Sequence, residues 1–147
     1  MKKNKISKNW LINQKRDLFF RQSKIEGYRS RAAYKLIEMN KKFKFLKKSS
    51  FVLDLGSCPG GWSQVAKKEI IKGKILAVDA KSMEKINKVD FIKGDFRENK
   101  IYEKIMVYFN NKADVVLSDV AANTSGNKAY DSYRTGDLCL SAMSLAT

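Results

Sequence analysis

The sequence predicts a single α/β domain with a mostly parallel, doubly wound sheet. Four short apolar runs, at residues 51–55, 74–79, 89–92 and 113–119, alternate with stretches of helical periodicity. The first run leads into a glycine-rich turn and then a helix start, so backbone N–H groups converge at one spot. A length of 147 residues suits one domain with one core.

The glycine-rich turn reads Gly56-Ser-Cys-Pro-Gly-Gly61 and is followed by Trp62 and Ser63. Glycines at such a turn let a ligand approach the main chain closely. A P-loop is excluded because it needs lysine and then serine or threonine after its last glycine. A dinucleotide fingerprint is disfavoured because Cys58 stands where its second glycine belongs. S-adenosylmethionine (SAM) is the remaining nucleotide-type ligand, and the alternative is a turn that only tightens the strand–helix connection.

A carboxylate lies in or near the carboxyl end of each apolar run. These acids are Asp54, Asp79, Asp95 and Asp119. In an open parallel sheet the ligand crevice lies at those strand ends, so we expect the four to share one pocket. Asp79 follows Gly56 by 23 residues, the spacing of an acid that binds ribose hydroxyls. Asp95 could accept a hydrogen bond from an adenine amino group. The alternative for each acid is a chance helix cap.

Three further helices complete the predicted elements. Ser30 is expected to cap a helix that continues to about residue 42, and Lys35 lies among its apolar positions. From this helix alone, Lys35 is more simply explained as a lysine whose stem packs on apolar surface. Helices are also expected at residues 101–109 and 133–146, with a loop at residues 123–126.

The positive charge is concentrated before the glycine turn. Residues 1–50 hold 16 lysines and arginines against three acids, whereas the whole chain carries a net +15. We therefore divide the chain into a basic N-terminal arm, residues 1–29, with one short helical stretch, and a domain, residues 30–147. Such an arm is typical of a surface that binds a phosphate backbone, and planar guanidinium groups pair well with phosphate. The alternative is a general lysine bias of the genome.

Several classes of protein lose support from composition. The chain has no histidine, and its two cysteines, Cys58 and Cys139, form no metal or redox motif, so zinc sites and Ser–His–Asp triads are disfavoured. No apolar run is long enough to span a bilayer, and no secretory signal is evident. We expect a cytoplasmic protein with no metal and no membrane partner.

Four motifs in this order resemble the FtsJ-like (RrmJ) family of ribosomal RNA large-subunit 2'-O-methyltransferases. They are Ser30-Arg-Ala-Ala-Tyr-Lys-Leu36, Asp54-Leu-Gly-Ser-Cys-Pro-Gly-Gly-Trp-Ser-Gln64, Gly94-Asp-Phe-Arg97 and Leu117-Ser-Asp-Val-Ala-Ala-Asn-Thr-Ser-Gly126. The resemblance covers residues 24 to about 145. Cys58 departs from it, standing where a small residue such as alanine is usual, and we expect little consequence.

The resemblance implies a Rossmann-like SAM-dependent methyltransferase fold and methylation of a ribose 2'-hydroxyl on a uridine of 23S rRNA in the large ribosomal subunit. It implies SAM as cofactor, and we expect a monomer. Gly60 and Trp62 would hold the methionine part of SAM, Asp79 the ribose and Asp95 the adenine. Asp119 would lie near the methyl-donor centre. Lys35 and Asp119 match the first two members of a catalytic Lys–Asp–Lys–Glu set, and the RNA contacts expected on the basic surface are Lys24, Arg29 and Arg31.

The second lysine and the glutamate of that set have no counterpart here. Lys128 is the only lysine after Asp119, and no glutamate follows Glu103. The last three strands of the family's seven-stranded sheet are also missing. We therefore expect a C-terminally truncated chain with an exposed fourth strand and little activity alone. Two alternatives stay open: a non-catalytic RNA-binding module that retains an adenosyl site, and an NAD-type protein.

Overall fold

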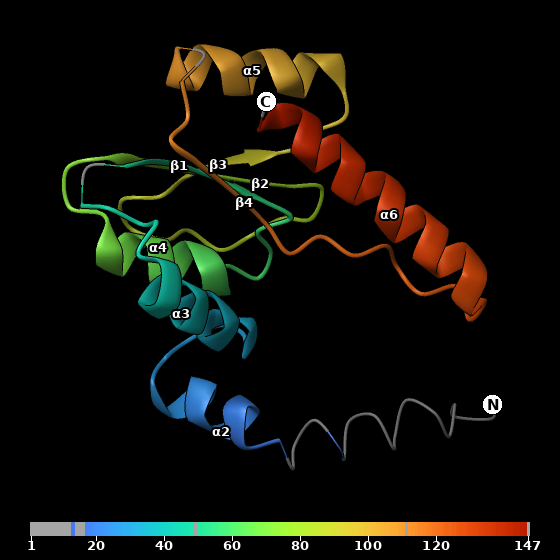
Figure 1. Ribbon diagram of the computed structural model, residues 1–147, viewed down its shortest axis with the longest axis horizontal. Helices are drawn as coiled ribbons and strands as arrows, with labels where there is room; N and C mark the ends of the chain where they lie inside the picture. The colour runs from blue at the N-terminus through green and yellow to red at the C-terminus, as the bar shows by residue number, and fades with distance from the viewer. Residues whose placement is uncertain (1–12, 14–16, 49, 111, 147) are drawn as a thin grey trace.

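A four-stranded parallel sheet forms the centre of the computed structural model, which describes residues 13, 17–48, 50–110 and 112–146 (Figure 1). Its strand order is β3-β2-β1-β4, and every pair is parallel. The strands are β1 (Phe51–Leu55), β2 (Lys74–Asp79), β3 (Asp90–Lys93) and β4 (Val115–Ser118). The predicted α/β class and parallel sheet are confirmed.

The helices of the described residues are α2 (Leu18–Ile25), α3 (Ala32–Phe43), α4 (Gly61–Glu69), α5 (Asn99–Phe109) and α6 (Lys128–Leu145). None of them is long and apolar enough to cross a membrane. α2 lies within the predicted basic arm, of which residues 1–12 and 14–16 are outside the described part of the chain.

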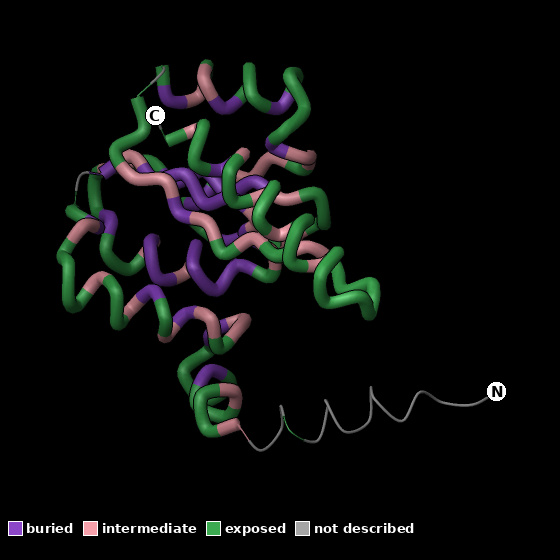
Figure 2. The backbone as a smooth tube through the Cα atoms, turned by 45° about the vertical axis from the view of Figure 1, so that its right-hand side comes forward, coloured by how far each residue is buried: buried purple, intermediate pink, exposed green. Residues whose placement is uncertain are grey.

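Helices cover both faces of the sheet, as a doubly wound fold requires. Side chains alternate between faces along a strand, so Val52 joins the core beneath α3 and α4, whereas Leu53 joins the core beneath α5 and α6. Figure 1 shows α3 and α4 on one side of the strands and α5 and α6 on the other. In Figure 2 the two central strands, β1 and β2, are mostly buried, whereas α6 is mostly exposed and buries only Ala142.

Two predicted helix starts are wrong. Ser30 does not cap α3; Arg31 holds that position, and no side chain caps the helix. The Ser30 hydroxyl instead packs against Gly61, where an added Cβ would lie 2.3 Å from its Oγ. The last helix begins at Lys128 rather than near residue 133, because the Asn127 side chain accepts hydrogen bonds from the N–H groups of Ala129 and Tyr130 and so caps an earlier turn.

β1 lies at the point where the strand order reverses. β2 and then β3 lie on one side of β1, and β4 lies on its other side. The carboxyl ends of β1, β2 and β4 therefore border the crevice expected in such sheets. β4 pairs with β1 alone among the described strands, which leaves its other edge unpaired. Cavities of about 650 and 570 Å³ flank β4, and the smaller of the two is largely apolar.

Among the glycines, Gly73 leaves the least room for a side chain. A Cβ at this position would lie 1.9 Å from the carbonyl oxygen of Ser50, a main-chain atom that cannot rotate away. We expect Gly73→Ala to destabilise the protein by about 1–3 kcal/mol or more and to lower its melting temperature by several degrees.

The matched control for this substitution is Gly136→Ala. Gly136 lies within α6, and an added Cβ there would meet nothing within 4 Å. Because alanine favours a helix over glycine by about 0.5–1 kcal/mol, this variant should hold or raise the melting temperature. Equal melting temperatures for the two variants would contradict the steric argument.

Candidate active site

A cavity of about 360 Å³ opens at the carboxyl ends of the strands. Three carboxylates line it, from Asp79 after β2, Asp95 after β3 and Asp119 after β4, together with Gly56 from the turn after β1. Its other lining residues are Cys58, Ala80, Lys81, Gly94, Phe96, Arg97, Val120, Ala121, Ala122, Asn123, Arg134 and Leu138. The sheet therefore brings together three of the four acids predicted to share a pocket.

Gly56 lets two strand ends come together at this cavity. Its φ is +69°, and a Cβ there would lie 2.4 Å from Val120 Cγ1. A side chain would therefore push the turn after β1 away from the segment after β4, which are two walls of the same cavity.

Asp79 fixes the wall formed by the glycine turn. One carboxylate oxygen accepts a hydrogen bond from the N–H of Cys58 at 2.9 Å, and the other accepts from the N–H of Lys81 at 2.7 Å. The backbone on both sides is thereby held in place, and each oxygen keeps a further lone pair for a ligand hydroxyl.

Asp95 is tied to a residue that we assigned no role. The side chain of Arg97 donates to both carboxylate oxygens, with Nε 2.9 Å from Oδ1 and 3.1 Å from Oδ2. These hydrogen bonds hold the pKa of Asp95 below its ordinary value. Arg97 also lies 3.8 Å from Asp137 of α6, so it bridges the wall after β3 to that helix.

Lys35 meets Asp119 across a sequence separation of 84 residues, with Nζ 2.8 Å from Oδ1. The lysine side chain is 60% exposed and the aspartate side chain 39% exposed, so the ammonium remains open to a substrate. The Lys35 Nζ also lies 5.6 Å from the centre of the Trp62 ring. Lys35 is thus held beside the cavity, through an acid that lines it.

Asp54, the fourth predicted crevice acid, is not in the cavity. It is 1% exposed, and its Oδ2 accepts a hydrogen bond from Ser63 Oγ at 2.6 Å. The shared-pocket prediction is wrong for this residue because its side chain is directed under the turn, toward the first helical turn of α4. Burial raises the pKa of Asp54 to about 7 against the opposing hydrogen bond from Ser63, and the nearby Asp119 and Asp79 add to the rise.

Gly60 and Trp62 are not among the residues that line this cavity. A Cβ at Gly60 would meet Ile86 and Met83 instead. The indole of Trp62 donates to the carbonyl oxygen of Ala32 at 2.8 Å, which fastens the first turn of α3 to α4. Contacts of these two residues with a methionine moiety stay a prediction.

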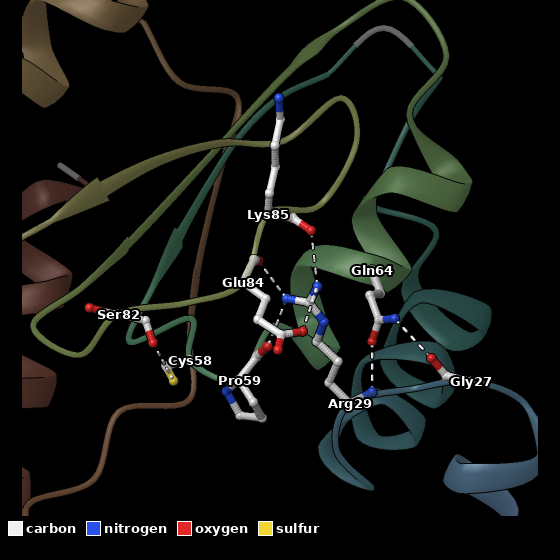
Figure 3. A network of polar contacts seen from close by, with 8 residues as sticks. All are labelled: Gly27, Arg29, Cys58, Pro59, Gln64, Ser82, Glu84 and Lys85. Carbon is white, nitrogen blue, oxygen red and sulfur yellow. Dashed lines mark hydrogen bonds and ion pairs between the residues drawn. The ribbon is translucent and has the colours of Figure 1, made fainter.

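The three predicted RNA contacts differ in their surroundings. Lys24 Nζ lies 5.6 Å from the centre of the Phe20 ring, and Arg31 pairs with Asp17 at the start of α2. The guanidinium of Arg29 is directed into the protein, where it donates to three main-chain carbonyl oxygens (Figure 3). The RNA-binding role of all three stays a prediction.

A comparison with known protein families identifies the family to which this chain belongs. The model for the FtsJ-like methyltransferase matches residues 28–147, most of the chain. This chain belongs to the FtsJ-like methyltransferase family.

Relatives of this FtsJ-like methyltransferase agree in their names. It is 49% identical over 146 residues to "Ribosomal RNA large subunit methyltransferase E" of Pelagibacter ubique, covering 99% of this chain and 72% of that protein. The protein of the same name from Rickettsia akari is 44% identical, over 95% of this chain and 64% of that protein. A crystal structure of a ribosomal RNA methyltransferase from Plasmodium falciparum superposes with a TM-score of 0.70 at 39% identity, covering 79% of this chain and 69% of that one.

Several residues that line the cavity of this FtsJ-like methyltransferase were not predicted from the sequence. Arg97 stands two residues after Asp95, so its position in the motif was the available signal. Arg134 and Leu138 come from α6, and no periodicity in that helix indicated that it borders the cavity. No group of three or more histidine, cysteine, aspartate or glutamate side chains in the described ranges is arranged to hold a metal ion.

Proposed function

We propose that this chain binds S-adenosylmethionine in the cavity at the strand ends and contributes Lys35 and Asp119 to methylation of a ribose 2'-hydroxyl on a uridine of 23S rRNA. The observation that carries the proposal is the Lys35–Asp119 ion pair beside a cavity lined by Asp79, Asp95 and Asp119. On this proposal, the 147 residues alone turn over slowly, because they hold only two of the four residues of the family's catalytic set.

The residues of the cavity fit such a cofactor. Its volume of about 360 Å³ falls in the range of small-molecule sites, about 300–1,000 Å³. Asp79 has acceptors for ribose hydroxyls, and Asp119 offers negative charge to a cation. Asp95 accepts four hydrogen bonds from Arg97, so an adenine amino group would have to replace one of them. S-adenosylmethionine would supply an activated methyl group on a positively charged sulfonium. Lys81, Arg97 and Arg134 balance the three carboxylates of the lining, so the attraction for this charge would come from Asp119 locally.

Lys35 has a chemical task that its exposure permits. A ribose hydroxyl is a poor nucleophile near neutral pH, and an adjacent ammonium stabilises the alkoxide character that develops on its oxygen. Asp119 holds the ammonium at 2.8 Å and so limits its motion. Correct placement of the hydroxyl can lower the barrier by several kcal/mol, about 7–11 at most.

The substrate assignment is supported by two kinds of observation. The curated relatives carry the name of a ribosomal RNA large subunit methyltransferase, and 16 of the chain's 30 lysines and arginines lie in residues 1–50. Lys35 belongs to this basic part of the chain, whose positive charge favours binding of a phosphate backbone.

The test combines binding with methyl transfer. Calorimetry should show binding of S-adenosylmethionine and none of NAD. Prolonged incubation with labelled S-adenosylmethionine and undermethylated large subunits should give a small yield of 2'-O-methyluridine, and Lys35→Ala should lower that yield at least about tenfold while leaving cofactor affinity within about threefold. NAD binding, or label on a base rather than a ribose, would refute the proposal.

A non-catalytic RNA-binding module that retains an adenosyl site is the second candidate, because these 147 residues supply Lys35 and Asp119 but not the second lysine and the glutamate of the set. It predicts salt-sensitive RNA binding and S-adenosylmethionine binding without labelled product in the same assay. Turnover equal to that of a full-length relative would refute both this candidate and the slow-turnover part of the first.

A further inference from the structure

Arg29 connects three separate segments of the chain. It lies between α2 and α3, and its side chain is only 24% exposed. Figure 3 shows its guanidinium directed toward the glycine turn and the loop that follows β2. Glu84 is a weak partner, at 3.9 Å and 93% exposed, so the main-chain contacts are what hold the guanidinium.

The guanidinium donates to carbonyl oxygens of two different loops. Nη1 donates to Pro59 of the glycine turn at 3.2 Å and to Glu84 of the loop after β2 at 2.7 Å. Nη2 donates to Lys85 of the same loop at 3.0 Å. A planar fork with several fixed N–H groups can bridge such oxygens, whereas a lysine ammonium is a single point of charge.

Gln64 fixes the backbone from which Arg29 extends. Its Oε1 accepts from the N–H of Arg29 at 2.8 Å, and its Nε2 donates to the carbonyl oxygen of Gly27 at 2.9 Å (Figure 3). Because Gln64 lies in α4, both ends of its amide fasten the entrance of the arm to the helix that begins at the glycine turn.

Gly60 leaves the space that this arrangement needs. It adopts φ +112°, and a Cβ there would lie 3.2 Å from Arg29 Nη1, 3.1 Å from Met83 Sδ and 2.8 Å from Ile86 Cδ1. The bare side of Gly60 therefore faces Arg29 and the loop after β2. Packing alone therefore explains why this position is a glycine, whether or not it contacts a ligand.

The two loops joined by Arg29 are also walls of the cofactor cavity. Cys58 stands next to Pro59, and Asp79 and Lys81 begin the loop that continues to Glu84 and Lys85. They are joined on the cavity side by the hydrogen bond from the Cys58 N–H to Asp79, and Cys58 Sγ contacts the Ser82 carbonyl oxygen at 3.6 Å. Arg29, which is not among the residues that line the cavity, therefore joins the same two loops by separate hydrogen bonds.

We propose that Arg29 is a positioning residue of the cofactor site, which holds the Pro59 turn against the loop after β2, rather than a ligand of RNA phosphate. The inference rests on the proposed function, since the cavity is taken to hold S-adenosylmethionine. It links the basic arm to cofactor affinity through defined hydrogen bonds.

The test uses Arg29→Lys, which keeps the positive charge and removes the fork. We expect this variant to bind S-adenosylmethionine about tenfold more weakly, the equivalent of about 1.4 kcal/mol. The salt dependence of its RNA affinity should equal that of the wild-type chain. The charge control is Lys104→Gln on the exposed side of α5, which should change neither cofactor affinity nor the loop after β2.

Opposite results would overturn the inference. Cofactor affinity of Arg29→Lys within twofold of wild type would show that the fork positions nothing. The inference would also fail if Arg29→Ala left cofactor affinity unchanged and reduced the slope of log RNA affinity against log salt concentration by about one. That change of slope is the signature of a lost phosphate contact.

A second measurement decides the question without any cofactor. Limited trypsin digestion should cut the loop after Lys81, Lys85 or Lys88 at least about fivefold faster in Arg29→Lys than in the wild-type chain, because the loop has lost its fastening. Unchanged cleavage would refute the positioning role. Faster cleavage in a protein that binds no S-adenosylmethionine would support the fastening and refute only the proposed function.

Discussion

Asp54→Asn should flatten the dependence of stability on pH between about pH 4 and pH 7. The folded protein holds the Asp54 carboxyl at a pKa of about 7, above the ordinary value of 3.8, because the group is buried beside Asp79 and Asp119. Below pH 3.8 the carboxyl is protonated in both the folded and the unfolded chain. As the pH rises toward 7, the unfolded chain releases this proton more readily, so unfolding becomes easier.

The expected size follows from the linkage. One pKa unit corresponds to about 1.4 kcal/mol, so this single carboxyl lowers the free energy of unfolding by on the order of 4 kcal/mol between pH 4 and pH 8. Asparagine cannot ionise. In urea denaturation, the midpoint of the wild-type chain should therefore fall between pH 5 and pH 8 by about 1–2 M more than the midpoint of Asp54→Asn.

Ser63→Ala is the matched control for this experiment. The Ser63 hydroxyl donates to Asp54 and lowers its pKa, so its removal should steepen the same pH dependence. The difference between the two pH values cancels any constant cost of either substitution. A wild-type chain and Asp54→Asn variant with parallel pH profiles would contradict a raised pKa at Asp54.

Asp79→Ala should weaken binding of S-adenosylmethionine by about 100-fold. Hydrogen bonds to a charged group contribute about 1.5–3 kcal/mol each, and the variant loses the acceptors proposed for ribose hydroxyls. It also frees the N–H groups of Cys58 and Lys81, so the cavity wall is no longer fixed. Isothermal titration calorimetry measures the effect directly.

Asp79→Asn and Glu103→Gln are the comparisons for that titration. The asparagine keeps one acceptor oxygen and should lose about tenfold, between alanine and the wild type. Glu103 is exposed on α5, so Glu103→Gln removes one negative charge without altering the cavity after β2. Equal losses in Asp79→Ala and Glu103→Gln would show that general charge, rather than Asp79, attracts the ligand.

The sheet and much of the site could be predicted from sequence because both follow from local patterns. Apolar runs set the strands, and strand ends of a parallel sheet must meet on one edge, which placed Asp79, Asp95 and Asp119 together. Lys35 illustrates the limit of helix periodicity. The helical pattern favoured a lysine whose aliphatic part packs on apolar surface. Only the family motif indicated that Lys35 pairs with Asp119, which lies 2.8 Å away.

The remaining features depend on packing between distant segments. The sequence marks Asp54 as another strand-end acid, but the side chain is buried because Ser63 at the start of α4 binds it. Ser30 looks like a helix cap, yet the close approach of Gly61 determines its place. Arg29 looks like an RNA contact in a basic arm, and the folded chain supplies it with three carbonyl oxygens from loops 30 and more residues away.

Asp119 serves two neighbours with one negative charge. It forms part of the cavity wall, and the same carboxylate holds the Lys35 ammonium. If the proposed cationic methyl donor binds beside Asp119, this carboxylate would lie between two positive charges, the ammonium on one side and the sulfonium on the other. A single side chain would then hold the two groups that the proposed reaction needs next to each other.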